Sequence, residues 1–81
     1  MEGAVLADLG HEYGVSGDRL RQIVYQTKAL DLLKRSRVVD TGRIATVLTQ
    51  LGTAHGFAGD RAKQLSMHTE ATTMIERPRC A

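Results

Sequence analysis

Arg21 and Gln22 stand side by side in the stretch DRLRQIVYQ, and Tyr25 follows three residues later. An arginine can donate two hydrogen bonds to a guanine edge, and a glutamine amide can bond an adenine edge in the same two-point manner. Tyrosine adds a hydroxyl group and an aromatic ring. On the outward face of one helix, these side chains have the chemistry to read base pairs in the major groove of DNA. We therefore predict that Arg21, Gln22 and Tyr25 are base-reading residues.

The stretch that must position them is LADLGHEYGVSGDRLRQI, residues 6–23. Its apolar residues recur at the three- and four-residue spacing of a helix on both sides of a glycine-containing segment. We predict a tight turn at Gly14, because glycine adopts left-handed backbone conformations without steric cost. Val15 should then pack into the core, and Ser16 should cap the second helix. The small Gly10 would let the two helices approach closely.

These residues resemble a known motif. Without a gap, residues 6–23 are similar to the C-terminal DNA-binding helix-turn-helix of bacterial sigma-seventy-type factors, which read the promoter minus-35 element. The matching positions are Leu9, Gly10, Val15, Arg19, Arg21, Gln22 and Ile23. Gly17 departs from those motifs, which usually carry a longer side chain at that point. The resemblance covers 18 of the 81 residues and implies DNA binding, with RNA polymerase as a further partner if it reflects common descent.

The motif occurs twice in the chain. Shifting the sequence by 42 residues lays residues 1–39 over residues 43–81 with thirteen identical positions, where average amino-acid usage would give two or three by chance. The identities include GDR at 17–19 and at 59–61. We predict a tandem of two helix-turn-helix units, residues 1–39 and 43–81, joined by residues 40–42. The structural glycines of the two turns would be Gly10, Gly14, Gly52 and Gly56.

The fold class that follows is all-α, with about four helices packed as one small helical domain. The first unit should form helices over residues 4–13 and 17–35, the second of them burying an apolar stripe that includes Leu20 and Val24. Asp40 or Thr41 can cap a third helix, and the fourth should span residues 59–76, with Pro78 marking its end.

The repeat also extends the predicted DNA contacts to the second unit. Its outward face carries Lys63 and Gln64 as base readers. Phosphate contacts are predicted for Ser16, Arg19, Arg35, Arg37 and Arg61. The net charge is only +2, but residues 18–43 hold seven basic and three acidic side chains, and this local excess suits a phosphate-facing surface.

Other function classes have little support. His11, His55 and His68 share no repeated spacing with an acid or a cysteine, so we expect no enzyme activity, no metal site and no cofactor. No stretch approaches the roughly 18 apolar residues of a membrane span. The single cysteine, Cys80, allows no internal disulfide. We therefore expect a protein of the cytoplasm, or of the nucleus in a eukaryote.

Two hypotheses follow for the function. The first is sequence-specific binding of double-stranded DNA in transcription regulation, with the two recognition helices acting like a dimer in one chain. The second is a helical protein-interaction or dimerisation module, a bundle or a histone-like homodimer, without base-specific readout. A weak similarity of residues 34–52 to the last part of a histone fold belongs to this second hypothesis.

Overall fold

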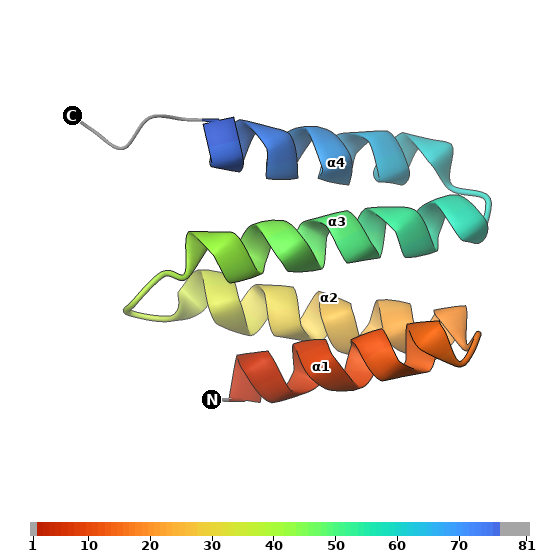
Figure 1. The fold of residues 1–81 in the computed structure, drawn as a ribbon, viewed down its shortest axis with the longest axis horizontal. Coiled ribbons are helices and arrows are strands. Elements are labelled where there is room, and N and C mark those ends of the chain that lie inside the picture. The colour runs from red at the N-terminus through yellow and green to blue at the C-terminus, as the bar shows by residue number, and fades with distance from the viewer. Residues whose placement is uncertain (1, 77–81) are drawn as a thin grey trace.

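The computed structural model describes residues 2–76, and these form four α-helices joined by short turns (Figure 1). The helices are α1 (Glu2–Val15), α2 (Arg19–Arg35), α3 (Thr41–Phe57) and α4 (Arg61–Glu76). No strand occurs among these residues, so the prediction of an all-α domain with four helices is confirmed. Consecutive helices run antiparallel, and α1 and α3 therefore run in the same direction. Pro78 and Cys80 lie outside the described residues.

The helices form an open array instead of a closed bundle. The hairpin of α1 and α2 packs on the hairpin of α3 and α4 chiefly through α2 and α3, while α1 and α4 do not touch. The array measures 41 × 28 × 16 Å along its principal axes. Stacked helical hairpins of this kind are the units from which α-solenoids are built.

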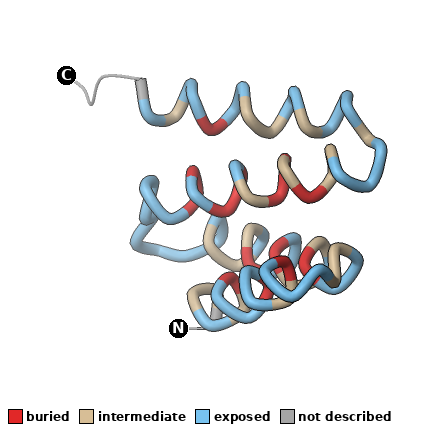
Figure 2. The backbone as a smooth tube through the Cα atoms, turned by 45° about the vertical axis from the view of Figure 1, so that its right-hand side comes forward, coloured by how far each residue is buried: buried red, intermediate tan, exposed pale blue. Residues whose placement is uncertain are grey.

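The core is centred on α3. Figure 2 shows the buried positions concentrated on this helix, whereas α4 is mostly exposed. The two adjoining clusters of the core share partners from the other helices, including Leu30 and Leu33 of α2 and Met67 of α4. The fully buried large apolar side chains all belong to α3: Ile44, Val47, Leu48 and Leu51.

Both hairpins turn through the same backbone structure. Gly17 has a φ of 93° and Gly59 a φ of 95°. In the first turn the Gly17 N–H donates to the Gly14 carbonyl (3.0 Å) and the Asp18 N–H to the Tyr13 carbonyl (2.8 Å). The second turn repeats this pair of bonds 42 residues later, at 3.1 and 2.8 Å. This is a Schellman motif, which ends a helix with glycine in the left-handed conformation.

The turn predicted at Gly14, and with it that at Gly56, is therefore wrong. Both glycines lie inside helices, and the chain reverses three residues later. Val15 is 71% exposed instead of packing into the core. Ser16 does not cap α2, because its hydroxyl donates to the Tyr13 carbonyl.

Aspartates cap the helices that follow the turns and the central loop. The Asp18 carboxylate accepts from the Arg21 N–H at 3.1 Å, and Asp60 accepts from the Lys63 N–H at 3.0 Å. Asp40 caps α3 in the same way, accepting from the Arg43 N–H at 3.0 Å. A carboxylate at this position satisfies an otherwise unpaired N–H and faces the positive end of the helix dipole.

Glycines within α1 make room for polar side chains of α2. A Cβ atom at Gly10 would lie 2.5 Å from Gln26 Cγ and 3.2 Å from the Gln26 backbone nitrogen. One at Gly14 would lie 2.5 Å from Gln22 Cδ. The second hairpin repeats the arrangement, with His68 against Gly52 and Gln64 against Gly56.

The apolar stripe predicted for α2 is consequently only partly buried. The buried residues of α2 are Gln22, Gln26 and Ala29, whereas Leu20 is 75% exposed.

No helix in the described part of the chain is both long and apolar enough to cross a membrane.

Candidate interaction surface

The predicted base-reading residues do not form one outward face. Gln22 is 5% exposed and lies against Gly14 of α1, so the expectation that it points outward is wrong. The cause is the gap that glycine leaves in α1, which a flat amide fills. Gln64 is half-buried at the equivalent place against Gly56, and Lys63 beside it is exposed.

Arg21 and Tyr25 belong to a small cluster on the outside of the first hairpin. The rings of Tyr13 and Tyr25 stack with their centroids 5.4 Å apart and their planes 6° from parallel. The Arg21 guanidinium lies 5.5 Å from the centre of the Tyr13 ring, and its Nε is 3.6 Å from an Asp18 oxygen. Arg21 is thus exposed but already has an aromatic and an acidic neighbour.

Much of the positive charge between residues 18 and 43 is balanced locally. Four of its seven cations form ion pairs with nearby carboxylates: Arg21–Asp18, Lys34–Glu70, Arg35–Asp31 and Arg43–Asp40. Of the other predicted phosphate ligands, Ser16, Arg37 and Arg61 are exposed on different parts of the molecule. Local pairing weakens the field that a phosphate backbone would meet.

Arg19 instead begins a chain of hydrogen bonds that crosses between the hairpins. Its Nη1 donates to Gln22 Oε1 at 3.2 Å, and Gln22 Nε2 donates to Gln26 Oε1 at 3.1 Å. Gln26, which is fully buried, donates from Nε2 to Gln50 Oε1 on α3 at 2.5 Å. The Arg19 guanidinium also lies 4.3 Å from the centre of the Phe57 ring at the end of α3. We call Arg19, Gln22, Gln26 and Gln50 the amide relay.

A groove opens above the amide relay, between the C-terminal halves of α1 and α3. Its volume is about 390 Å³, within the range of ligand-binding clefts. Three helices line it: His11, Gly14 and Val15 from α1, Arg19 and Gln22 from α2, and Thr49, Gln50 and Thr53 from α3. We call it the α1–α3 groove. A smaller hollow of about 290 Å³ lies on the other side of the same α3 residues and shares Thr49 and Gln50 with it.

The groove is well supplied with hydrogen-bonding groups. A guanidinium has five N–H donors and a glutamine amide has two, and the amide relay uses one from Arg19 and none from Gln50. Exposed His11 adds an imidazole on the opposite wall. The Thr49 and Thr53 hydroxyls donate to carbonyls one turn earlier in α3. The Thr49 oxygen can still accept, whereas the Thr53 oxygen lies 3.4 Å from His68 Nε2.

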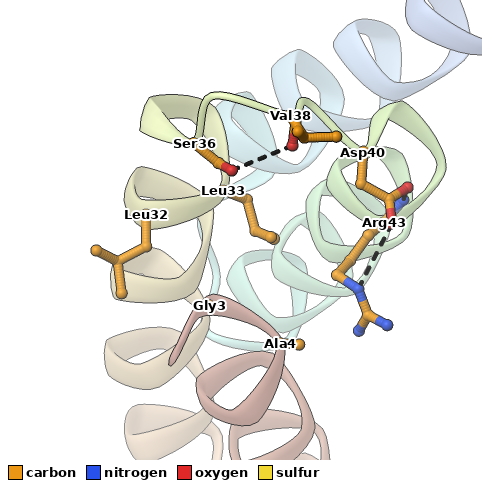
Figure 3. A pocket seen from close by; sticks show the side chains of 8 residues that line it. All are labelled: Gly3, Ala4, Leu32, Leu33, Ser36, Val38, Asp40 and Arg43. Carbon is orange, nitrogen blue, oxygen red and sulfur yellow. Dashed lines mark hydrogen bonds and ion pairs between the residues drawn. The ribbon is translucent and has the colours of Figure 1, made fainter. Parts of the chain in front are cut away.

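A larger and more apolar pocket lies at the opposite end of α1 and α3 (Figure 3). Its volume is about 660 Å³, and Leu32, Leu33 and Val38 contribute apolar side chains to it. Its one cation, Arg43, has its Nε 3.9 Å from an Asp40 oxygen. Three polar residues line this pocket, whereas six of the eight residues that line the α1–α3 groove are polar. Among the described residues, no group of three His, Cys, Asp or Glu side chains is placed to hold a metal ion.

The sequence reasoning missed the α3 side of the groove. A binding site could not be predicted from Thr49, Gln50 and Thr53 one by one, since threonine and glutamine are common on helix surfaces. The sequence did contain one pointer, because Thr46, Thr49, Gln50 and Thr53 recur at helical spacing and make one face of α3 polar up to Phe57 at the end of the helix.

Comparison of the chain with models of protein families, with curated proteins and with solved structures finds no match.

Proposed function

We propose that the protein is an interaction module of stacked helical hairpins that binds an extended polypeptide segment in the α1–α3 groove. The observation that carries this proposal is the groove itself, a cleft with six polar residues in its lining, which lies between two parallel, repeat-equivalent helices and is floored by the amide relay. Repeat proteins of this architecture characteristically use such surfaces for binding.

The chemistry of the groove favours a segment with acidic side chains. An extended polypeptide exposes backbone carbonyl and N–H groups that the Gln50 amide and the Thr49 oxygen can satisfy. A carboxylate on the segment would meet Arg19, whose fork of N–H donors suits that group. The floor is held in place by buried and partly buried hydrogen bonds, so the donors are arranged before binding, which lowers the entropic cost of association.

DNA reading is supported less well by this geometry. The resemblance to sigma-seventy-type motifs and the exposed side chains of Arg21 and Lys63 favour it. Against it, Gln22 is buried, and the turn at Gly17 gives an antiparallel hairpin (Figure 1). In a DNA-binding helix-turn-helix, the two helices cross at about 90–120°.

The test is selection of peptides from a random displayed library, followed by titration calorimetry with synthetic copies. Thr49 is exposed in the groove, so Thr49→Arg should fill the groove without disturbing the core and weaken binding at least about tenfold. Ser66→Arg, at an exposed site on α4 away from the groove, is the matched control and should bind as the wild type does.

A parallel titration with duplex DNA at several salt concentrations separates the two hypotheses. We expect weak, sequence-independent binding that disappears as salt rises, because few unpaired cations are available. Saturable, sequence-dependent DNA binding that Arg21→Ala abolishes, together with no selected peptide that Thr49→Arg weakens, would overturn the proposal.

A further inference from the structure

The contact between the two hairpins has a definite pair of surfaces. On α3, Val47 and Leu51 are 1% and 0% exposed. They pack in a cluster that includes Ile23 and Leu33 of α2. We call the α2 side of this contact the donor face and the α3 side the acceptor face.

The 42-residue repeat places a second acceptor face at one end of the molecule. The residues of α1 equivalent to Val47 and Leu51 are Val5 and Leu9. They are of the same type but are 64% and 39% exposed, because none of the described helices covers them as α2 covers Val47 and Leu51.

A second donor face lies at the other end of the molecule. The residues of α4 equivalent to Ile23 and Leu33 are Leu65 and Ile75. These are 65% and 69% exposed, whereas Ile23 and Leu33 are partly buried against α3. The two ends of the array therefore carry the two halves of a contact that the protein already makes inside itself.

We propose that these faces are covered by a second copy of this chain, with α4 of one molecule packed on α1 of the next as α2 packs on α3. The contact joins different surfaces of the two partners, so it is head-to-tail, and each dimer keeps one free face of each kind. Association then proceeds to longer linear assemblies.

Polar groups at the junction fit the same register. Inside the molecule, Gln26 of α2 donates to Gln50 of α3. The equivalent positions are His68 on α4 and Asp8 on α1. His68 Nε2 lies 3.1 Å from the Thr49 carbonyl of its own molecule, so Nδ1 is the ring nitrogen left to face the carboxylate of a neighbouring copy. The same register that joins the apolar faces thus places an imidazole opposite a carboxylate.

Two substitutions make the junction weaker than the internal contact. Leu30, which packs into the core clusters, is replaced at the equivalent position by Thr72. Phe57, which lies under Arg19, is replaced by Val15, so Arg61 meets no aromatic ring. Restoring both groups in Val15→Phe/Thr72→Leu adds apolar burial and a cation–π contact and should raise the association constant by about tenfold or more.

Sedimentation velocity over a concentration series tests the proposal. We expect the wild type to associate reversibly and the Val15→Phe/Thr72→Leu variant to associate at lower concentration. Val5→Lys blocks the acceptor face and Leu65→Lys blocks the donor face, and each variant alone should remain monomeric. Circular dichroism establishes that each variant is folded.

The mixture of the two blocked variants distinguishes this geometry from a symmetric dimer. Val5→Lys keeps its donor face and Leu65→Lys keeps its acceptor face, so a mixture should form dimers and nothing larger. A mixture that stays monomeric while the wild type associates would overturn the proposal. So would a Val15→Phe/Thr72→Leu variant that remains monomeric at millimolar concentration.

Discussion

Gly17 and Gly59 carry the turns on which both hairpins depend. Their φ values of 93° and 95° lie in the region that side chains with a Cβ rarely adopt. Neither position is crowded, since a Cβ built there meets no atom within 4 Å. The requirement for glycine is therefore one of backbone conformation alone.

Replacing Gly17 by alanine should lower the free energy of unfolding by about 1–2 kcal/mol, the cost of a left-handed conformation for a residue with a Cβ. Gly42→Ala is the matched control, because Gly42 lies within α3, has ordinary space around it and a φ outside that region. It should raise stability by about 0.4–1 kcal/mol. Urea denaturation of the two variants gives both values. Equal changes in the free energy of unfolding for Gly17→Ala and Gly42→Ala would contradict a conformational requirement for glycine in the turn.

The turn was predicted at the wrong glycine because residues 14–17, GVSG, contain two glycines. Gly14 ends the apolar spacing of the first helix, whereas Gly17 is followed by an aspartate that can cap the next helix. The repeated pair of glycine and aspartate, at 17–18 and at 59–60, was the available signal. A Schellman glycine followed directly by a capping residue explains both positions together.

At the scale of the helices, the buried face of α2 is set by the shape of its partner. The apolar spacing of α2 predicts burial of Leu20, but the gaps at Gly10 and Gly14 receive the amides of Gln26 and Gln22 instead. Helix positions, the Asp40 cap and the all-α class follow from the sequence because they depend on local patterns. The orientation of α2 depends on two neighbours at once, so local patterns do not determine it.

Removing the central amide of the relay tests its contribution. Gln26→Leu should lower the free energy of unfolding by about 1–3 kcal/mol, because it leaves the buried Gln22 amide and the Gln50 oxygen without their partners. Lys28→Leu, an exposed site two residues along α2, is the control and should change stability by less than about 0.5 kcal/mol. A Gln26→Leu variant as stable as the wild type would show that the relay adds nothing to folding.

At the scale of the whole molecule, equivalent residues in the two halves have different surroundings. Leu51 is covered by the first hairpin, and its equivalent, Leu9, is 39% exposed at the end of the array. In repeat proteins, stability is approximately the sum of the repeats and the interfaces between them. The interface between the two hairpins, which buries Leu51, should therefore contribute to the stability of both of them.

Alanine at these two leucines measures that dependence. Leu51→Ala should cost about 2–5 kcal/mol, as is usual for a fully buried leucine, and it should destabilise both hairpins in one cooperative transition. Leu9→Ala should cost clearly less because part of its surface is already exposed to water. Denaturation at low protein concentration measures both losses of free energy. Losses of similar size for Leu51→Ala and Leu9→Ala would contradict the proposal that Leu51 is covered more fully than Leu9.

We propose above all that the α1–α3 groove binds a polypeptide. Nitrogen-15 correlation spectra, recorded while a selected peptide is titrated into the protein, test this directly. We predict that the largest shift changes fall on His11, Thr49, Gln50 and Thr53, and that duplex DNA leaves these signals unchanged. Peptide-induced changes confined to the outer faces of α2 and α4, or sequence-dependent changes at Arg21 and Lys63 with DNA alone, would contradict the claim.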